Sequence, residues 1–162
     1  MKLYYLASYY QLLMGIVHNQ KNKTTDKVVF VVDNFLMSTC GNIDQIVTEG
    51  LADELYSLPF IAIKENSLAW VINEAEKQLL EFPYKLEEFD EIFVAASHSW
   101  FGIYLASKKI EFSMFEECCG ILSKVFKLRE NVEKLGNSTY NAFVDFYNKH
   151  IADETDGSSL GL

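Results

Sequence analysis

Hydrophobic and polar positions alternate along the chain in blocks that predict strands separated by helices. Short continuous apolar runs are typical of strands buried on both faces, and apolar residues spaced three and four positions apart predict helices. The gaps between the runs are long enough for the crossover helices that join parallel strands. We therefore expect strands at residues 3–7, 28–32, 60–63, 92–96 and 110–115.

A helix-start signal follows the first of these runs directly. Ser8 and Gln11 form the S-x-x-Q pattern of a capping box, in which the serine accepts from a backbone N–H and the glutamine reaches back. Apolar residues at core spacing follow it, and we expect one face of this helix to pack on the sheet through Leu12, Leu13, Ile16 and Val17. Ser67 and either Ser97 or Ser99 are expected to cap later helices.

Taken together, the blocks predict an α/β fold, Rossmann-like, with a mostly parallel sheet flanked by helices over residues 1–122. The strand order does not follow from the pattern. Residues 123–162 lack further strand runs and predict a C-terminal helical extension with a frayed end. The chain thus contains one α/β unit and no second one.

Composition excludes several classes of function. The net charge of −9, without a run of Lys or Arg, argues against a surface for nucleic acid or for an anionic membrane. The three cysteines have no C-x-x-C spacing, which indicates neither a disulfide framework nor a zinc site, so no metal is expected. No G-x-G-x-x-G or P-loop pattern is present, and no cofactor is expected. Because no apolar run is long enough to span a membrane, we expect a cytoplasmic protein that is not membrane-spanning.

Candidate binding residues lie where strands end, because ligands of open α/β sheets bind outside the carboxyl ends of the strands. Ser8 and Gln11 can hydrogen-bond a sugar there, although the capping box explains both without a ligand. Asp33 follows the second run and can bind a hydroxyl or turn the chain. Ser97, His98 and Trp100 bring hydroxyl, imidazole and indole groups to another strand end, as a carbohydrate pocket requires, but a helix cap and a core tryptophan explain them equally well.

An acidic pair, Glu116 and Glu117, follows the last apolar run. A carboxylate at the end of a buried strand can be partly desolvated, which raises its pKa and suits it to act as a general base. Acidic pairs are also common on solvated surfaces. The pair fits a hydrolase less well. The two carboxylates of a glycosidase lie on opposite sides of the scissile bond, about 5 to 9 Å apart, and neighbours in sequence on a strand rarely do so.

Three short segments resemble the N-terminal domain of bacterial family 52 glycosyltransferases and related polysialyltransferase-like proteins. They are the opening LYYLASYYQLL at 3–13, IFVAAS at 92–97 and FEE at 115–117. The resemblance implies the acceptor-side half of a GT-B enzyme, in which two Rossmann-like domains face each other across a cleft. It also implies inverting, sialyltransferase-like transfer in the synthesis of capsular polysaccharide or lipooligosaccharide, peripheral to the bacterial inner membrane.

The same resemblance assigns the catalytic base to Glu117 or Glu116, which match the two acids of the family motif. Cys118 stands where the family has glycine, and the His-Pro element that holds CMP on the second domain is missing here. The expected partners are a glycan acceptor and, only through a second domain, a CMP-sugar donor, so we expect the chain to be inactive alone. The alternative is a non-enzymatic α/β binding or regulatory module. The donor sugar, the linkage and the oligomeric state remain open.

Overall fold

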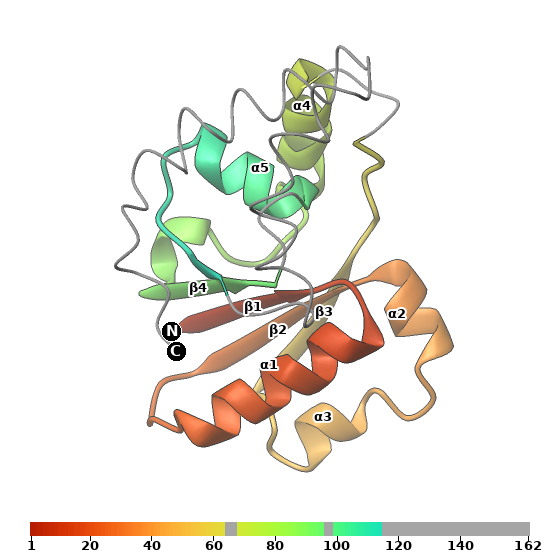
Figure 1. Cartoon of the computed structure of the whole chain (residues 1–162), viewed down its shortest axis with the longest axis vertical. Helices are drawn as coiled ribbons and strands as arrows, with labels where there is room; N and C mark the ends of the chain where they lie inside the picture. Colours follow the sequence, from red (N-terminus) through yellow and green to blue (C-terminus); the bar gives the residue numbers. More distant parts are fainter. Residues whose placement is uncertain (64–67, 96–98, 115–162) are drawn as a thin grey trace, which may run out of the picture.

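A computed structural model describes residues 1–63, 68–95 and 99–114. This part of the chain is an α/β fold with a Rossmann-like arrangement, in which strands and helices mostly alternate (Figure 1). The strands are β1 (Lys2–Leu6), β2 (Val28–Asp33), β3 (Glu54–Leu58), β4 (Glu91–Val94) and β5 (Ser113–Met114). The helices are α1 (Tyr9–Lys21), α2 (Asn34–Thr39), α3 (Gln45–Thr48), α4 (Leu68–Leu79), the 3₁₀ turn η1 (Leu86–Glu88) and α5 (Trp100–Ser107).

All the described strands form one parallel sheet in the order β3-β2-β1-β4-β5. The central strand β1 pairs with β2 from Lys2↔Val28 to Leu6↔Val32, and with β4 on its other side. The chain first builds outward from β1 to β3 and then returns to add β4 and β5. The strand order therefore reverses beside β1, which places a topological switch point between β1 and β4.

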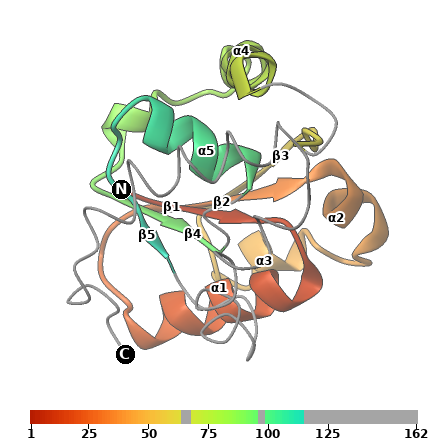
Figure 2. The ribbon, with the colours of Figure 1, turned by 45° about the horizontal axis from the view of Figure 1, so that its top comes forward.

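Helices cover both faces of the sheet. Figure 2 shows α4 and α5 on one side and α1 and α3 on the other. Alternate residues of β1 serve the two faces, as the period of a strand requires. Leu3 and Tyr5 pack in the cluster under α4 and α5, whereas Tyr4 and Leu6 pack in the cluster under α1 and α2. Because both faces of β1 are covered, its run is continuously apolar after Lys2.

Helix α1 approaches the sheet closely at Gly15. A Cβ atom at this position would lie 2.8 Å from Cδ2 of the buried Leu6, which is closer than ordinary van der Waals contact. The glycine therefore lets the helix pack directly on the end of β1. This contact fixes the depth of α1 over the edge at which the candidate residues lie.

The expected strands at 3–7, 28–32 and 92–96 are confirmed as β1, β2 and β4, and β5 lies within 110–115. The expected strand at 60–63 is wrong, because the third strand is β3, Glu54–Leu58. β3 is an edge strand with mostly half-buried residues, so its sequence ELYSL mixes polar and apolar residues and lacks a continuous apolar run. Phe60, which suggested the strand, is 66% exposed and follows Pro59.

The expected face of the first helix is also partly wrong. Leu12 is buried and Ile16 packs against the same core cluster, as expected, but Leu13 is 57% exposed and Val17 is 50% exposed. The buried positions of α1 are Gln11, Leu12, Gly15 and Asn19. A glycine and two polar residues thus share the core side with Leu12 and Ile16, and Leu13 and Val17 lie on the exposed side of the helix.

Candidate functional site

The carboxyl ends of β1, β2 and β4 meet at one edge of the sheet, called here the carboxyl edge. Helices α1 and α2 begin directly after β1 and β2, and α5 begins a few residues after β4 (Figure 1). Each of these helices starts with a side-chain cap from Ser8, Asp33 or Ser99. The polar residues at this edge therefore have a local structural role, which is to satisfy backbone N–H groups at helix starts.

Ser8 and Gln11 cap α1 from both sides. The Ser8 hydroxyl accepts a hydrogen bond from the Gln11 backbone N–H at 3.2 Å, and Gln11 Oε1 accepts one from the Ala7 backbone N–H at 2.6 Å. Gln11 is buried, with 4% of its surface exposed. The glutamine thus reaches one residue further back than in the usual capping box, and it ties the end of β1 to the first turn of α1.

Asp33 performs the same task for α2. Its Oδ1 accepts a hydrogen bond from the Leu36 backbone N–H at 2.6 Å, and the residue is only 5% exposed. A carboxylate at a helix start is stabilised by the N–H groups that point toward it. The charge therefore has a favourable partner although it lies at the boundary of the core.

Trp100 begins α5, and its indole lies in the core with 1% of its surface exposed. Its ring packs edge-on against Tyr5, with 5.5 Å between centroids, and against Phe101 at the same distance. The neighbouring Ser99 accepts a hydrogen bond from the Gly102 backbone N–H at 3.1 Å. Of the two expected caps, Ser99 is the one seen to make this bond.

Two buried polar atoms stand out behind this edge. In the part of the chain that the structure describes, neither the Tyr5 hydroxyl nor Trp100 Nε1 has a hydrogen-bond partner. Burial raises the pKa of Tyr5 well above its usual range, and the charge of Asp33 raises it further, whereas the indole N–H of Trp100 opposes the rise. The two polar atoms are therefore neighbours whose geometry is too poor for a hydrogen bond between them.

Sequence reasoning did not select Tyr5. The available signal was the pair of tyrosines in a strand expected to be buried on both faces, because each buried hydroxyl needs a partner or a function. Four expected site residues, Ser97, His98, Glu116 and Glu117, lie outside the described residues.

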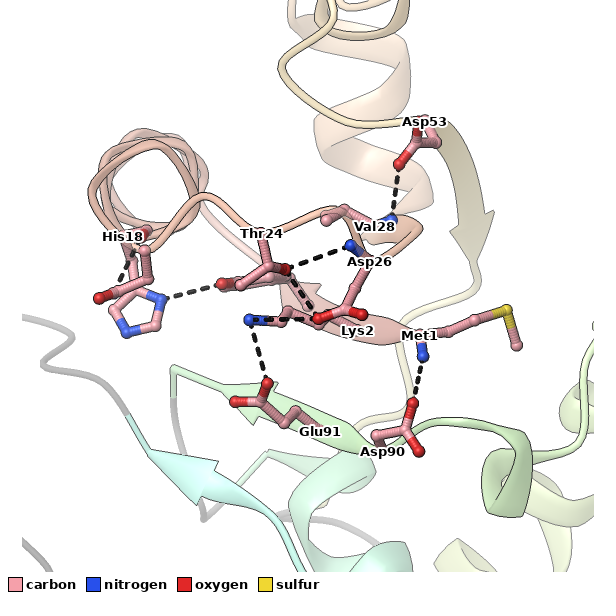
Figure 3. Close-up of polar contacts among 11 residues, drawn as sticks. Met1, Lys2, His18, Thr24, Asp26, Val28, Asp53, Asp90 and Glu91 are labelled. Atoms are coloured by element: carbon pink, nitrogen blue, oxygen red, sulfur yellow. Dashed lines mark hydrogen bonds and ion pairs between the residues drawn. The ribbon is translucent and has the colours of Figure 1, made fainter.

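The opposite edge of the sheet, called the amino edge, is rich in ion pairs. Figure 3 shows Lys2 between Glu91 and Asp26, with Nζ 3.0 Å from the Glu91 carboxylate and 4.0 Å from that of Asp26. The Met1 amine pairs with Asp90 at 2.5 Å, and Asp53 accepts from the Val28 backbone N–H at 2.7 Å.

A second network at this edge links β2, β3 and the segment before η1. Lys27 Nζ lies 2.5 Å from Glu54 and donates to the Tyr84 hydroxyl at 2.7 Å, and that hydroxyl donates to Glu54 at 2.7 Å. Hydrogen bonds from Lys27 and then Tyr84 lower the pKa of Glu54 to about 2. The network stabilises the ionised carboxylate and thereby holds the start of β3 beside β2.

Tyr4 and His18 form a partly buried pair between β1 and the last turns of α1. The Tyr4 hydroxyl lies 2.9 Å from His18 Nδ1, and the imidazole also packs on Phe93 with 4.8 Å between centroids. Burial, followed by the nearby charge of Lys2, lowers the pKa of His18. The neutral imidazole is therefore favoured at this position, which suits an aromatic surrounding.

Two hollows occur on the described surface. One of about 260 Å³ lies at the amino edge and is lined by residues such as Asn19, Asp26 and Asp53, and one of about 170 Å³ lies beside the end of β3. Both are smaller than the roughly 300 to 1,000 Å³ typical of small-molecule sites. Within the described ranges, no group of three or more His, Cys, Asp or Glu side chains is placed to hold a metal ion.

None of the helices in the described part of the chain has the length and apolar character needed to cross a membrane. Comparison of the chain with protein-family models and with curated protein sequences gives no match.

Proposed function

We propose that this chain is the N-terminal, acceptor-side half of an inverting GT-B glycosyltransferase of the sialyltransferase-like kind. In this proposal the complete enzyme adds sugars to a surface or capsular polysaccharide or to lipooligosaccharide. It works in the cytoplasm, peripheral to the inner membrane of a bacterium. The donor CMP-sugar binds a second domain, so this half alone is inactive.

The observation that carries the proposal is the topological switch point between β1 and β4. Ligands of open α/β sheets bind in the crevice outside the carboxyl ends of the strands at such a point. At this point the starts of α1 and α5, capped by Ser8 and Ser99, follow the ends of β1 and β4, and we place the acceptor site between them. The two segments that flank it, 3–13 and 92–97, are also two of the three that resemble the glycosyltransferase family.

The chemistry behind this crevice suits a hydroxylated ligand. The Tyr5 hydroxyl and the Trp100 indole N–H are buried donors, and the Asp33 carboxylate lies close enough to influence the hydroxyl. Both side chains are at most 2% exposed, so they form the wall behind the proposed site, and rigid aromatic walls with a few polar groups are common in ligand sites. We assign Ser8, Gln11, Asp33, Ser97, His98 and Trp100 to the acceptor side of the site.

The reaction requires one proton acceptor. As the acceptor oxygen attacks the anomeric carbon of the donor sugar, its proton passes to a carboxylate, the bond to the CMP phosphate breaks, and the configuration inverts. We assign the carboxylate to Glu117, with Glu116 orienting it. The chain leaves β5 at Met114, at the carboxyl edge and two residues before Glu116. A positioned base typically contributes about 10² to 10⁴ in rate.

Titration of the 162-residue chain tests which half of the enzyme it is. We expect calorimetry with CMP to give no saturable heat, because no described segment offers a nucleotide site. We expect an oligosaccharide acceptor to shift the amide resonances of the first turns of α1 and α5. Saturable micromolar binding of CMP would show that the chain is the donor half. Acceptor binding by a protein whose reading frame encodes no second α/β domain would favour the non-enzymatic module.

A further inference from the structure

Helix α1 is apolar on the side that faces away from the sheet. Its core side consists of Gln11, Leu12, Gly15 and Asn19. On the opposite side Tyr9, Tyr10, Leu13 and Val17 are each between 45% and 57% exposed. Their spacing of three and four residues makes a continuous stripe along the helix. An apolar stripe on the exposed side of a helix commonly marks a contact surface, which indicates a partner for this one.

The stripe continues onto α2. The Tyr9 hydroxyl donates to Thr39 Oγ1 at 2.8 Å, which holds the two helices together, and Phe35 on α2 is 65% exposed. We call the set Tyr9, Tyr10, Leu13, Val17 and Phe35 the α1 surface. Because both helices begin at the carboxyl edge, the α1 surface starts beside the proposed acceptor crevice and runs away from it along α1 (Figure 1).

We propose that the α1 surface docks on an anionic lipid bilayer, lying in the headgroup region. The chain as a whole is acidic, which argues against an anionic membrane, but its charge is unevenly placed, because residues 3–20 contain no charged side chain and all 23 acids follow residue 25. Of the three lysines in residues 1–25, Lys2 is buried and paired with Glu91, which leaves Lys21 and Lys23 for a lipid surface. Lys21 and Lys23 are exposed at the end of the stripe, where they can reach lipid phosphates. Tyrosines, which have an apolar body and a polar tip, suit the same depth.

Size and charge favour a bilayer over a second copy of the chain. Five side chains exposed to this degree offer on the order of 500 Å², below the ~800 Å² per partner of a standard protein interface. An interfacial helix needs only a stripe of this kind with basic residues at its margin. The surrounding acidic protein is repelled by an anionic bilayer, which leaves the uncharged, lysine-bordered side as the one that can approach it.

The position of the α1 surface beside the proposed acceptor site suggests what docking on a bilayer would do. This part of the inference rests on the proposed function, in which the acceptor is a growing glycan. If that glycan is carried on a lipid, its sugar is presented just outside the bilayer. An enzyme that lies on the membrane through α1 and α2 then holds the starts of these helices, and hence its acceptor crevice, near the presented sugar.

The test is sedimentation of the complete chain with vesicles. We expect binding to vesicles of phosphatidylethanolamine and phosphatidylglycerol and weaker binding to phosphatidylcholine. Leu13→Gln combined with Val17→Gln should lower partitioning about tenfold on both kinds of vesicle. Lys21→Gln and Lys23→Gln should each lower it about fivefold on the anionic vesicles alone. The matched control is Leu80→Gln, which removes an aliphatic side chain that is 85% exposed in the other layer.

Four results would overturn the proposal. They are no vesicle binding, an equal loss with the Leu80 control, a dimer in light scattering that the Leu13 and Val17 changes dissociate, or a fall of several degrees in melting temperature in that double variant. The last two would identify a second copy or another part of this chain as the occupant. Vesicle binding without acceptor binding would leave this proposal standing and remove the glycosyltransferase one, and the reverse would do the opposite.

Discussion

The two edges of the sheet hold their strands, loops and helix starts in place by different interactions. At the amino edge, strands and loops are joined by ion pairs, including those of Lys2 with Glu91 and of Lys27 with Glu54. At the carboxyl edge, side-chain caps such as Ser8 and Asp33 satisfy helix starts, and none of the ion pairs between described residues joins the strand ends. The amino edge is thus held together by charged pairs. Behind the carboxyl edge, the Tyr5 hydroxyl and Trp100 Nε1 have no hydrogen-bond partner among the described residues.

The largest expected effect lies at the carboxyl edge. Glu117→Gln in the full-length enzyme should lower turnover by about 10² to 10⁴, because glutamine keeps the size of the side chain but cannot accept the proton. The melting temperature and acceptor binding should stay unchanged. Asp90→Asn is the amino-edge control, since it removes the partner of the Met1 amine and should leave turnover as it was. Near-normal turnover in both Glu117→Gln and Glu116→Gln would place the base elsewhere.

Two neighbouring tyrosines of β1 allow a closer comparison, because each is at most 2% exposed. Tyr4→Phe removes the hydrogen bond to His18 and should cost about 1 kcal/mol of unfolding free energy. Tyr5→Phe removes a hydroxyl without a described partner, and should leave stability unchanged or raise it by up to about 1 kcal/mol. Urea unfolding of both variants measures the difference. An equal loss in Tyr5→Phe would show that its hydroxyl is paired.

A smaller effect is expected for the cohesive network at the amino edge. Glu54→Gln should cost less than about 1 kcal/mol at neutral pH, because the pair with Lys27 is partly exposed. The pKa of Glu54 is lowered from 4.5 to about 2, so its stabilisation is present above pH 4.5 and is lost as the pH falls through about 2. The variant should therefore lose less stability than the native chain over this range in acid unfolding. Glu81→Gln, at an exposed position, should leave the acid profile unchanged.

The smallest effect concerns His18. Because its pKa is lowered in the folded state, the unfolded chain binds a proton more readily, and the unfolding free energy falls as the pH drops below about 6.5. His18→Gln should flatten this part of the profile. Thermal melts across the mildly acidic range measure the slope. A steeper slope in the variant would mean that the folded protein favours the charged imidazole.

The sequence predicted the fold well where burial made the signal simple. β1, β2 and β4 are covered on both faces and contain continuous apolar runs, whereas the half-buried edge strand β3 mixes polar and apolar residues and was expected too late in the chain. For α1, apolar spacing selected Leu13 and Val17 as core residues. The close approach of Gly15 to Leu6 and the hydrogen bond of Gln11 to the Ala7 backbone turn a different face to the sheet, and the packing of Gly15 on Leu6 is tertiary structure that no local pattern contains.

The sequence predicted the edge of the sheet at which the candidate residues lie, but it did not predict their side-chain contacts. Parallel strands and capping residues bring Ser8, Asp33 and the start of α5 to one edge, as expected from the pattern. Which polar atoms remain without a partner depends on side-chain packing, and Tyr5 was missed for this reason. The strand order, and with it the switch point, also required the structure, because hydrophobic runs do not specify which strands are neighbours.

The strand order also governs how the protein is made. β1 gains its first neighbour, β2, early, but its second neighbour begins only at Glu91. Roughly 60 residues separate the end of β2 from β4, and a ribosome adding ~5–20 residues per second needs roughly 3 to 12 s to synthesise them. Throughout that interval one side of a strongly apolar strand has no partner, which is the kind of edge that recruits other chains. We therefore expect translation speed and chaperone access in this window to affect the yield of folded protein.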